Sequence, residues 1–320
     1  MREPPASLYV FRGLFSESPD PRQWPHVATG LTYRRAIAAL ADHFGCERAE
    51  NAVYERRLES DPAEYAASLL HATGTDWLLV DDGYPPRATG TSWDELGELA
   101  GCAAKPIMRI ERIVEELGPA AVADEVGTAR ERGFAALKTI AAYRGGLDID
   151  AAPPGVREAL VAALEANAAT GDPLPVQVHC GFGDSDLHLP RADPGWLKPL
   201  LERFTDTPFV LLHCYPFVRE AGWLAHVYGN VWFDLSLTIP HVARPAEALR
   251  EALELAPVSK LLYASDAART PELYLLAALW WREALAEVLE EALPPAAAEE
   301  AARMILRDNA LALYRLKFTG

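Results

Sequence analysis

Three residues that can bind a metal ion or transfer a proton lie at the ends of short apolar runs. His179 ends the run PVQVH, His213 ends PFVLLH, and Asp266 ends KLLYASD. A neutral imidazole is the commonest metal ligand in proteins and titrates near neutral pH. A carboxylate can bind a metal ion and accept a proton from water. The pattern predicts a metal site at which Asp266 and His213 also carry catalytic proton transfer.

Each of these residues also has a simpler structural alternative. A buried histidine can serve only as a hydrogen-bonding group, and Asp266 in YASDA could cap a helix. The shared position at strand ends favours function, because an α/β barrel builds its active site from the C-terminal ends of its strands.

Lys138 ends another apolar run, FAALK. A lysine there must be paired or have a lowered pKa, so it is predicted either to reach the metal site or to form an internal salt bridge with Glu111. Arg109 and Arg144 could each hold a substrate carboxylate with two hydrogen bonds, or could be solvated loop charges. The residues predicted to contact substrate are Arg109, Glu111, Tyr143, Arg144 and Asp184.

Cys180 and Cys214 each follow a strand-end histidine. Side chains alternate along a strand, so both thiols are predicted to point toward surrounding helices, buried, unbridged and without a catalytic role. The remaining histidines considered, His188, His226 and His241, are expected at the surface.

The elements that must position these groups alternate between strand and helix. Apolar runs begin near residues 77, 105, 134, 175, 208, 231 and 260, with helical stretches between them. This rhythm predicts parallel strands joined by right-handed crossovers, and hence a TIM-type (β/α)8 barrel. Only seven strands are evident, so an open doubly wound sheet is the alternative. No GxGxxG or GxxxxGK[ST] follows any strand, which disfavours a nucleotide site.

One domain over residues 1–320 is the simplest organisation. Residues 1–75 are expected to be irregular and helical, 76–270 to hold the barrel strands, and 271–320 to form C-terminal helices. Leu8–Phe15, LYVFRGLF, is the only run before residue 75 that could form a strand.

Composition limits the possible partners and compartment. The net charge of −16, from 46 acidic and 30 basic residues, would repel a nucleic-acid backbone or an anionic membrane. No window reaches the ~18 apolar residues of a membrane span. Four dispersed cysteines without CxxC are typical of a reducing cytoplasm. A small-molecule substrate is therefore expected, with a homo-oligomer possible.

Taken as a set, several segments resemble the amidohydrolase superfamily. They are HCGFGDSDLHL, VLLHCYPF, WFDLSL, LLYASDA and the terminal LRDNALALYRL. The resemblance is to the amidohydrolase-related branch, which includes the domain fused to glutamine-synthetase-like domains, and it extends from about Phe15 to the end of the chain. It implies a barrel with one or two divalent metal ions at its C-terminal mouth, and zinc is the expected ion.

The resemblance also implies individual roles. His179 corresponds to the metal ligand of the fifth barrel strand, His213 to the histidine of the sixth, and Asp266 to the aspartate of the eighth. Lys138 matches the fourth-strand position that is a metal-bridging lysine in some members.

One family feature is missing from this sequence. The first barrel strand of the family carries a His-x-His metal pair, and no HxH occurs here. We therefore expect a barrel without its first strand, either because that strand lies upstream of Met1 or because it was lost. A site built from His179, His213 and Asp266 alone should hold its metal weakly, since zinc sites usually have three or four protein ligands.

Three functions remain open from the sequence. The first is metal-dependent hydrolysis of an amide or other C–N bond in a small polar substrate. The second is decarboxylation on the same barrel, with Arg109 or Arg144 holding the carboxylate. The third is a degenerate barrel that only binds a ligand or a partner.

Overall fold

In the computed structural model, which describes residues 4–81, 83, 90–268 and 270–318, seven parallel strands form one curled sheet. Their order in the sheet is their order in the chain. The strands are β1 (Trp77–Asp81), β2 (Ala103–Arg109), β3 (Ala136–Thr139), β4 (Val176–Cys180), β5 (Phe209–His213), β6 (Val231–Asp234) and β7 (Leu261–Leu262).

The sequential order distinguishes this sheet from the doubly wound alternative. A doubly wound sheet reverses its strand order at a switch point, and no reversal occurs among these strands. Each strand pairs with the next, from Trp77 opposite Ala103 to Asp234 opposite Leu262. Within the described residues β1 and β7 each pair on one side only. The architecture is a half-barrel, equivalent to a TIM-type barrel lacking one strand.

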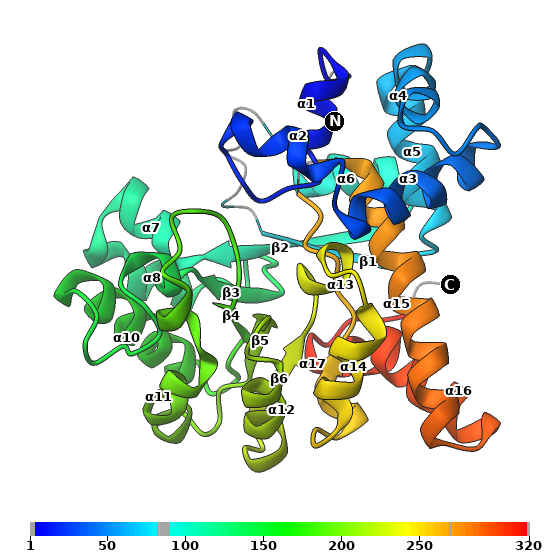
Figure 1. The fold of residues 1–320 in the computed structure, drawn as a ribbon. Helices are drawn as coiled ribbons and strands as arrows, with labels where there is room; N and C mark the ends of the chain where they lie inside the picture. The colour runs from blue at the N-terminus through cyan, green and yellow to red at the C-terminus, as the bar shows by residue number, and fades with distance from the viewer. Residues whose placement is uncertain (1–3, 82, 84–89, 269, 319–320) are drawn as a thin grey trace.

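Helices cover the outer face of the sheet and extend beyond it (Figure 1). Those between the strands are α6 (Trp93–Ala100), α7 (Ile110–Leu117), α8 (Val122–Gly127), α9 (Ala141–Arg144), α10 (Pro154–Ala169), α11 (Lys198–Arg203), α12 (Val218–Val227), α13 (Thr238–His241) and α14 (Pro245–Leu253). The chain ends with α15 (Pro271–Ala292), α16 (Pro295–Arg303), a π-helical turn (Met304–Asp308) and α17 (Asn309–Leu313).

The alternation of side chains divides the core into two parts. The larger part lies between sheet and helices and includes Val176, Val178, Phe209 and Leu211. The smaller part lies on the inner face and consists of Ile107, Ala136, Val210, Leu212, Leu262 and Tyr314. Tyr314 follows α17, and its hydroxyl accepts a hydrogen bond from Gln177 Nε2 at 3.0 Å. The C-terminal segment therefore fills part of the interior of the curled sheet.

The predicted strand at Leu8–Phe15 is wrong, because Leu8–Gly13 is a helix, α1. The side chain of Ser7 accepts a hydrogen bond from Val10 N and caps this helix. Phe11 is fully buried and packs against Phe15 and Tyr54. These contacts use the helical spacing of its aromatic residues rather than the alternation of a strand, so Leu8–Phe15 does not fill the space between β1 and β7.

The remaining N-terminal helices are α2 (Trp24–Val27), α3 (Leu31–Phe44), α4 (Glu50–Glu59) and α5 (Pro62–Ala72). They are anchored to α15 by a buried ion pair between Arg57 and Glu272, which also accepts a hydrogen bond from Tyr65. No helix in the described part of the chain is long and apolar enough to cross a membrane.

Candidate active site

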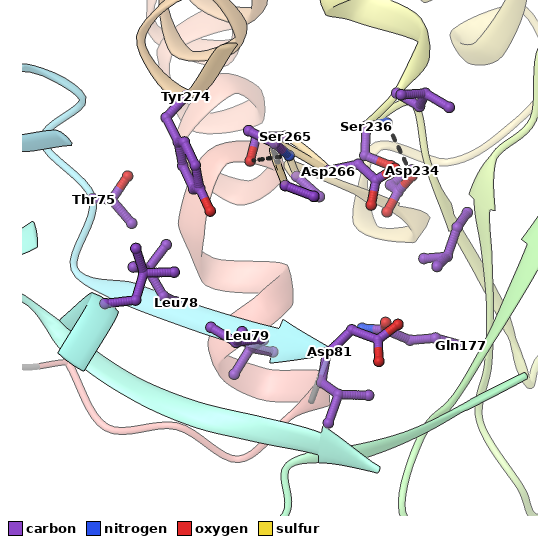
Figure 2. Close-up of a pocket in the computed structure, with 18 of the residues that line it drawn as sticks. Thr75, Leu78, Leu79, Asp81, Gln177, Asp234, Ser236, Ser265, Asp266 and Tyr274 are labelled. Carbon is purple, nitrogen blue, oxygen red and sulfur yellow. Dashed lines mark hydrogen bonds between the residues drawn. The ribbon is translucent and has the colours of Figure 1, made fainter. Parts of the chain in front are cut away.

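A cavity of about 1300 Å³ lies inside the half-barrel. Its lining includes residues from the ends of most strands, and also Leu78 and Leu79 of β1 and Leu262 of β7. Figure 2 shows Asp81, Leu78 and Leu79 along β1 on one side, with Asp266, Asp234 and Ser236 opposite. The cavity therefore joins the C-terminal mouth of the sheet to the space between its two edge strands.

His179 and His213 meet at this mouth. Their ring centroids are 4.6 Å apart, and both side chains are buried. The Nε2 atom of each ring is buried without a hydrogen-bond partner in the described structure. Burial lowers the pKa of both imidazoles well below its usual value. Both rings are therefore neutral at pH 7, and each can offer a nitrogen lone pair to a cation.

His213 reaches the cavity through an unusual backbone conformation. Phe209 and Leu211 pack outward and Val210 and Leu212 inward, so strict alternation would direct His213 outward. Instead His213 and Cys214 have φ values of 68° and 65°. These left-handed conformations turn the imidazole toward His179 and return Cys214 to the outer core. Such backbone strain is concentrated at functional sites.

Asp266 lies beside this pair. Its Oδ2 is 3.8 Å from His213 Nε2, and its side chain is 36% exposed. It also has a left-handed φ, of 51°. The structure thus brings His179, His213 and Asp266 together at one mouth, with Asp266 the most accessible of the three.

Lys138 lies in the same cavity, but its predicted partner is wrong. Lys138 Nζ is 3.5 Å from Asp81 Oδ2, whereas Glu111 accepts hydrogen bonds from Thr139 Oγ1 and Ile140 N. Asp81 ends β1, and this position brings its carboxylate within reach of the lysine at the end of β3.

Arg109 also binds Asp81. Its Nε is 3.1 Å from Asp81 Oδ2, and its Nη2 contacts the same oxygen. Burial alone would raise the pKa of Asp81, but the charges of Lys138 and Arg109 outweigh that effect and lower it. Arg109 and Lys138 therefore share one ionised carboxylate at the edge of the cavity.

The other predicted substrate contacts have mixed placements. Glu111 is in the first turn of α7 and is outside the cavity lining. Arg144 lines the cavity, but its Nη2 binds Glu115 at 3.0 Å and its side chain is 45% exposed. Tyr143 packs on His179 with ring centroids 4.7 Å apart. Its hydroxyl accepts a hydrogen bond from the backbone N–H of Asp184, which also lines the cavity.

Two cavity residues, Asp81 and Asp234, were missed as site residues. Asp234 ends β6 and is buried, and burial raises its pKa to about 6. Its Oδ1 accepts hydrogen bonds from the backbone N–H groups of His213 and Ser236. Both aspartates end apolar runs, WLLVD and VWFD. The same rule that selected His179 and His213 would have found them.

The prediction that Cys180 and Cys214 are buried and unbridged is confirmed, because both are buried free thiols. Their lack of a catalytic role stays a prediction. His188 and His226 are exposed as predicted, but His241 is not. Its side chain is only 11% exposed, and its Nδ1 lies 2.8 Å from Leu237 O. It ends α13, which packs on α15.

The donor set fits part of the coordination shell of a divalent cation. The observation is the pair of buried, unpartnered Nε2 atoms beside a carboxylate. The described residues contain no group of three or more His, Cys, Asp or Glu side chains already arranged around a metal position. Two imidazoles are therefore in place, and Asp266 would have to move to join them.

Comparison with known proteins gives a consistent family assignment. The profile of a family described as amidohydrolase matches residues 74–316. Protein fluG of Emericella nidulans is 39% identical over 161 residues, which are 48% of this chain and 19% of fluG. The chain spans less than half the length of the curated relatives that it matches.

Solved structures agree with this assignment. A chain from Lactobacillus casei ATCC 334, described as a metal-dependent hydrolase, superposes with a TM-score of 0.86 at 28% identity. That alignment covers 97% of this chain and 91% of the other. An uronate isomerase from Bacillus halodurans C-125 has a TM-score of 0.66 at 12% identity, over 98% and 84% of the two chains. The second likeness concerns the fold alone.

Proposed function

The chain belongs to the amidohydrolase family, and we propose that it is a metal-dependent hydrolase of an amide or other C–N bond in a small polar substrate. Family membership and the likeness to the Lactobacillus casei protein support a hydrolase-type function. The observation that carries the proposal is the pair of neutral, buried imidazoles whose Nε2 atoms have no hydrogen-bond partner in the described structure.

His179 and His213 would hold a divalent cation, of which zinc is the first candidate because imidazole nitrogen suits it. Asp266 would provide the carboxylate ligand. The protonated amine of Lys138 would repel the cation, so Lys138 could be a ligand only without that charge. When bound, the cation would supply Lewis acidity and lower the pKa of a water molecule.

The protein residues supply positioning and proton transfer. Asp266 is the accessible carboxylate of the group, so it would accept the proton from water and return it to the leaving nitrogen. Tyr143, whose ring packs at a tilt against His179, would limit the freedom of substrate beside that histidine. Asp184 and the Arg109–Asp81–Lys138 cluster would provide polar contacts to the rest of the substrate.

The decarboxylase alternative has less support. It requires Arg109 or Arg144 to hold a substrate carboxylate, yet Arg109 binds Asp81 and Arg144 binds Glu115. A substrate would have to displace a carboxylate already in place. The degenerate-barrel alternative is distinguished by metal content.

The test combines metal analysis with product analysis. Purified protein is titrated with zinc, and bound zinc is measured at equilibrium, because a site with only three protein ligands should hold the metal weakly. Release of ammonia or amine from a panel of small amides is assayed in the same solutions. Carbon dioxide release is measured in parallel. His179→Gln and His213→Gln are compared with His226→Gln, which replaces an exposed histidine on α12.

We expect the wild type and His226→Gln to bind zinc and release amine. Loss of a residue that only supports a metal ligand typically lowers metal affinity or activity about 10–100-fold. Loss of a ligand itself should therefore lower kcat/KM by about 100-fold or more. Zinc retained in both His179→Gln and His213→Gln, or turnover unaffected by removing zinc, would contradict the proposal. Carbon dioxide as the product would favour the decarboxylase.

A further inference from the structure

The ring of His213 is held by a hydrogen-bonded chain that begins at the end of β6. His213 Nδ1 is 2.6 Å from Ser236 Oγ, and Ser236 Oγ is 2.8 Å from Asp234 Oδ1. All three side chains are buried, at 1–3% exposure. Two strands that follow one another in the sheet thus contribute one continuous polar line that ends at the imidazole.

The direction of the protons in this line follows from Asp234. Its Oδ1 already accepts the backbone N–H groups of His213 at 2.8 Å and Ser236 at 3.0 Å, so this oxygen acts as an acceptor. The Ser236 hydroxyl therefore donates its one proton to Asp234. Its oxygen then faces Nδ1 with a lone pair, and Nδ1 must be the nitrogen that carries hydrogen.

One other donor lies near Nδ1. The Leu237 N–H is 3.5 Å away, a distance at which a hydrogen bond is weak, whereas the Ser236 contact is 2.6 Å. The Ser236 contact therefore decides the tautomer. With hydrogen on Nδ1, the lone pair of the neutral ring is on Nε2, the atom that faces the cavity without a partner.

We infer that Ser236, oriented by Asp234, is a positioning residue that fixes His213 as the Nδ1–H tautomer and so presents the Nε2 lone pair to the cavity. The tautomer follows from the hydrogen bonds alone. Its consequence for a metal ion rests on the proposed function. A ligand histidine whose other nitrogen is bonded to a fixed acceptor is both oriented and made more basic.

The neighbouring hydroxyl of Thr238 offers a matched control. Thr238 is buried, and its Oγ1 donates to the backbone carbonyl of His213 at 2.6 Å, not to the ring. Thr238→Val removes this hydrogen bond with little change of shape. Ser236→Ala removes the ring acceptor, and Ser236→Thr retains a hydroxyl.

The experiment reads the tautomer directly. Metal-free protein labelled with 15N-histidine is examined by long-range 1H–15N correlation, and His213→Gln identifies the His213 signals among those of the eight histidines. Zinc dissociation constants are measured for the same proteins by competition with a chelating dye. Thermal unfolding confirms that each variant is folded.

We expect wild type, Ser236→Thr and Thr238→Val to carry hydrogen on Nδ1. Ser236→Ala should shift the population toward Nε2–H and weaken zinc binding about 10–100-fold. Hydrogen on Nε2 in the wild type overturns the inference even if Ser236→Ala fails to fold. An unchanged tautomer in folded Ser236→Ala, or an equal shift in Thr238→Val, also overturns it.

Failure of the proposed function gives a different result. If no protein binds zinc but Ser236→Ala still changes the tautomer as expected, the positioning role is supported and the metal-dependent function is contradicted.

Discussion

A single carboxylate at the end of β1 holds two cations at the edge of the cavity. Asp81 pairs with Arg109 and with Lys138, and the side chains of all three are at most 17% exposed. The charges of Lys138 and Arg109 also contribute to the low pKa of His179, although burial contributes most. Asp81 therefore limits how much positive charge the imidazoles experience.

We predict that Asp81 and Arg109 are energetically coupled. Asp81→Asn should lower the free energy of unfolding by about 3 kcal/mol, because it removes the ionised carboxylate that Arg109 and Lys138 share at the edge of the cavity. Arg109→Gln in the same chain should recover part of that loss, giving a non-additivity of about 0.5–3 kcal/mol in a double-mutant cycle from urea unfolding. The exposed pair Arg144–Glu115 is the control and should couple by at most about 1 kcal/mol. Equal coupling in the two cycles would contradict the prediction.

A second prediction concerns Glu111. Burial raises its pKa, despite hydrogen bonds from Thr139 and Ile140 that favour the charged form. A carboxyl group whose folded pKa exceeds its unfolded value stabilises the protein at low pH and loses that contribution as pH rises through the folded value. Glu111→Gln keeps an acceptor oxygen and removes the charge. Relative to wild type, this variant should become more stable as pH rises from about 4 to 8. Urea unfolding across that range measures the difference in free energy of unfolding between the variant and wild type. A difference that is constant with pH would show that burial does not raise the pKa of Glu111.

At the scale of elements, the loop after β4 depends on two glycines with different constraints. Gly181 has a φ of 72°, and a Cβ there would be 2.3 Å from the backbone oxygen of Tyr215. At Gly183 a Cβ would be 1.9 Å from the hydroxyl of Tyr143 and 3.2 Å from His179 Nε2. The first glycine faces fixed backbone, and the second faces a side chain that can rotate away.

The two alanine substitutions should therefore affect different properties, stability at Gly181 and zinc affinity at Gly183. Gly181→Ala should lower the free energy of unfolding by at least about 1–2 kcal/mol, from the left-handed conformation alone, and the contact with Tyr215 adds to this. Gly183→Ala should leave stability within about 1 kcal/mol but displace Tyr143 and crowd His179 Nε2. Its zinc affinity and turnover should fall. Thermal unfolding and zinc titration on both variants are the measurements, and the opposite ranking would refute this account of the loop.

The position of His179 and His213 at strand ends predicted that their side chains would meet. The alternation rule used to orient them holds for His179 but not for His213. Alternation along PVQVH correctly places His179 on the inner face and Cys180 on the outer face. The same rule applied to PFVLLH would place His213 outward, and the two left-handed residues that reverse it leave no signature in the residue types. The pairing of Lys138 with Asp81 depends on which strand ends lie opposite one another, which a local pattern does not contain.

At the scale of the whole molecule, the count of seven strands and their parallel order followed from the strand–helix rhythm. The segments that lie inside the half-barrel could not be predicted in this way. Leu8–Phe15 had the composition of a strand, but its aromatic residues pack at helical spacing outside the sheet. Tyr314 enters the interior from the other end of the chain and bonds Gln177. Such long-range contacts are decided by the shape of the assembled sheet.

The two edge strands lead to a prediction about the stability of the sheet. In the described structure β1 pairs only with β2, and β7, two residues long, pairs only with β6. Beyond β7 the backbone N–H of Tyr263 is bonded to Ile305 O in the π-helical turn. By contrast, β4 and β5 are paired on both sides and buried throughout. Unpaired strand edges open readily, and they can pair with another chain.

Hydrogen exchange followed by mass spectrometry tests this difference. Peptides that cover Trp77–Asp81 and Leu261–Leu262 should exchange about 100-fold or more faster than those covering Val176–Cys180 and Phe209–His213, which should open only with global unfolding. The measurement is repeated at two protein concentrations. Protection of β1 that increases with concentration would mean that a second copy covers the edge, since a strand edge is a template for pairing between chains. Protection of β1 equal to that of β5 at high dilution would contradict the prediction, because it would require a partner for this edge within the same chain.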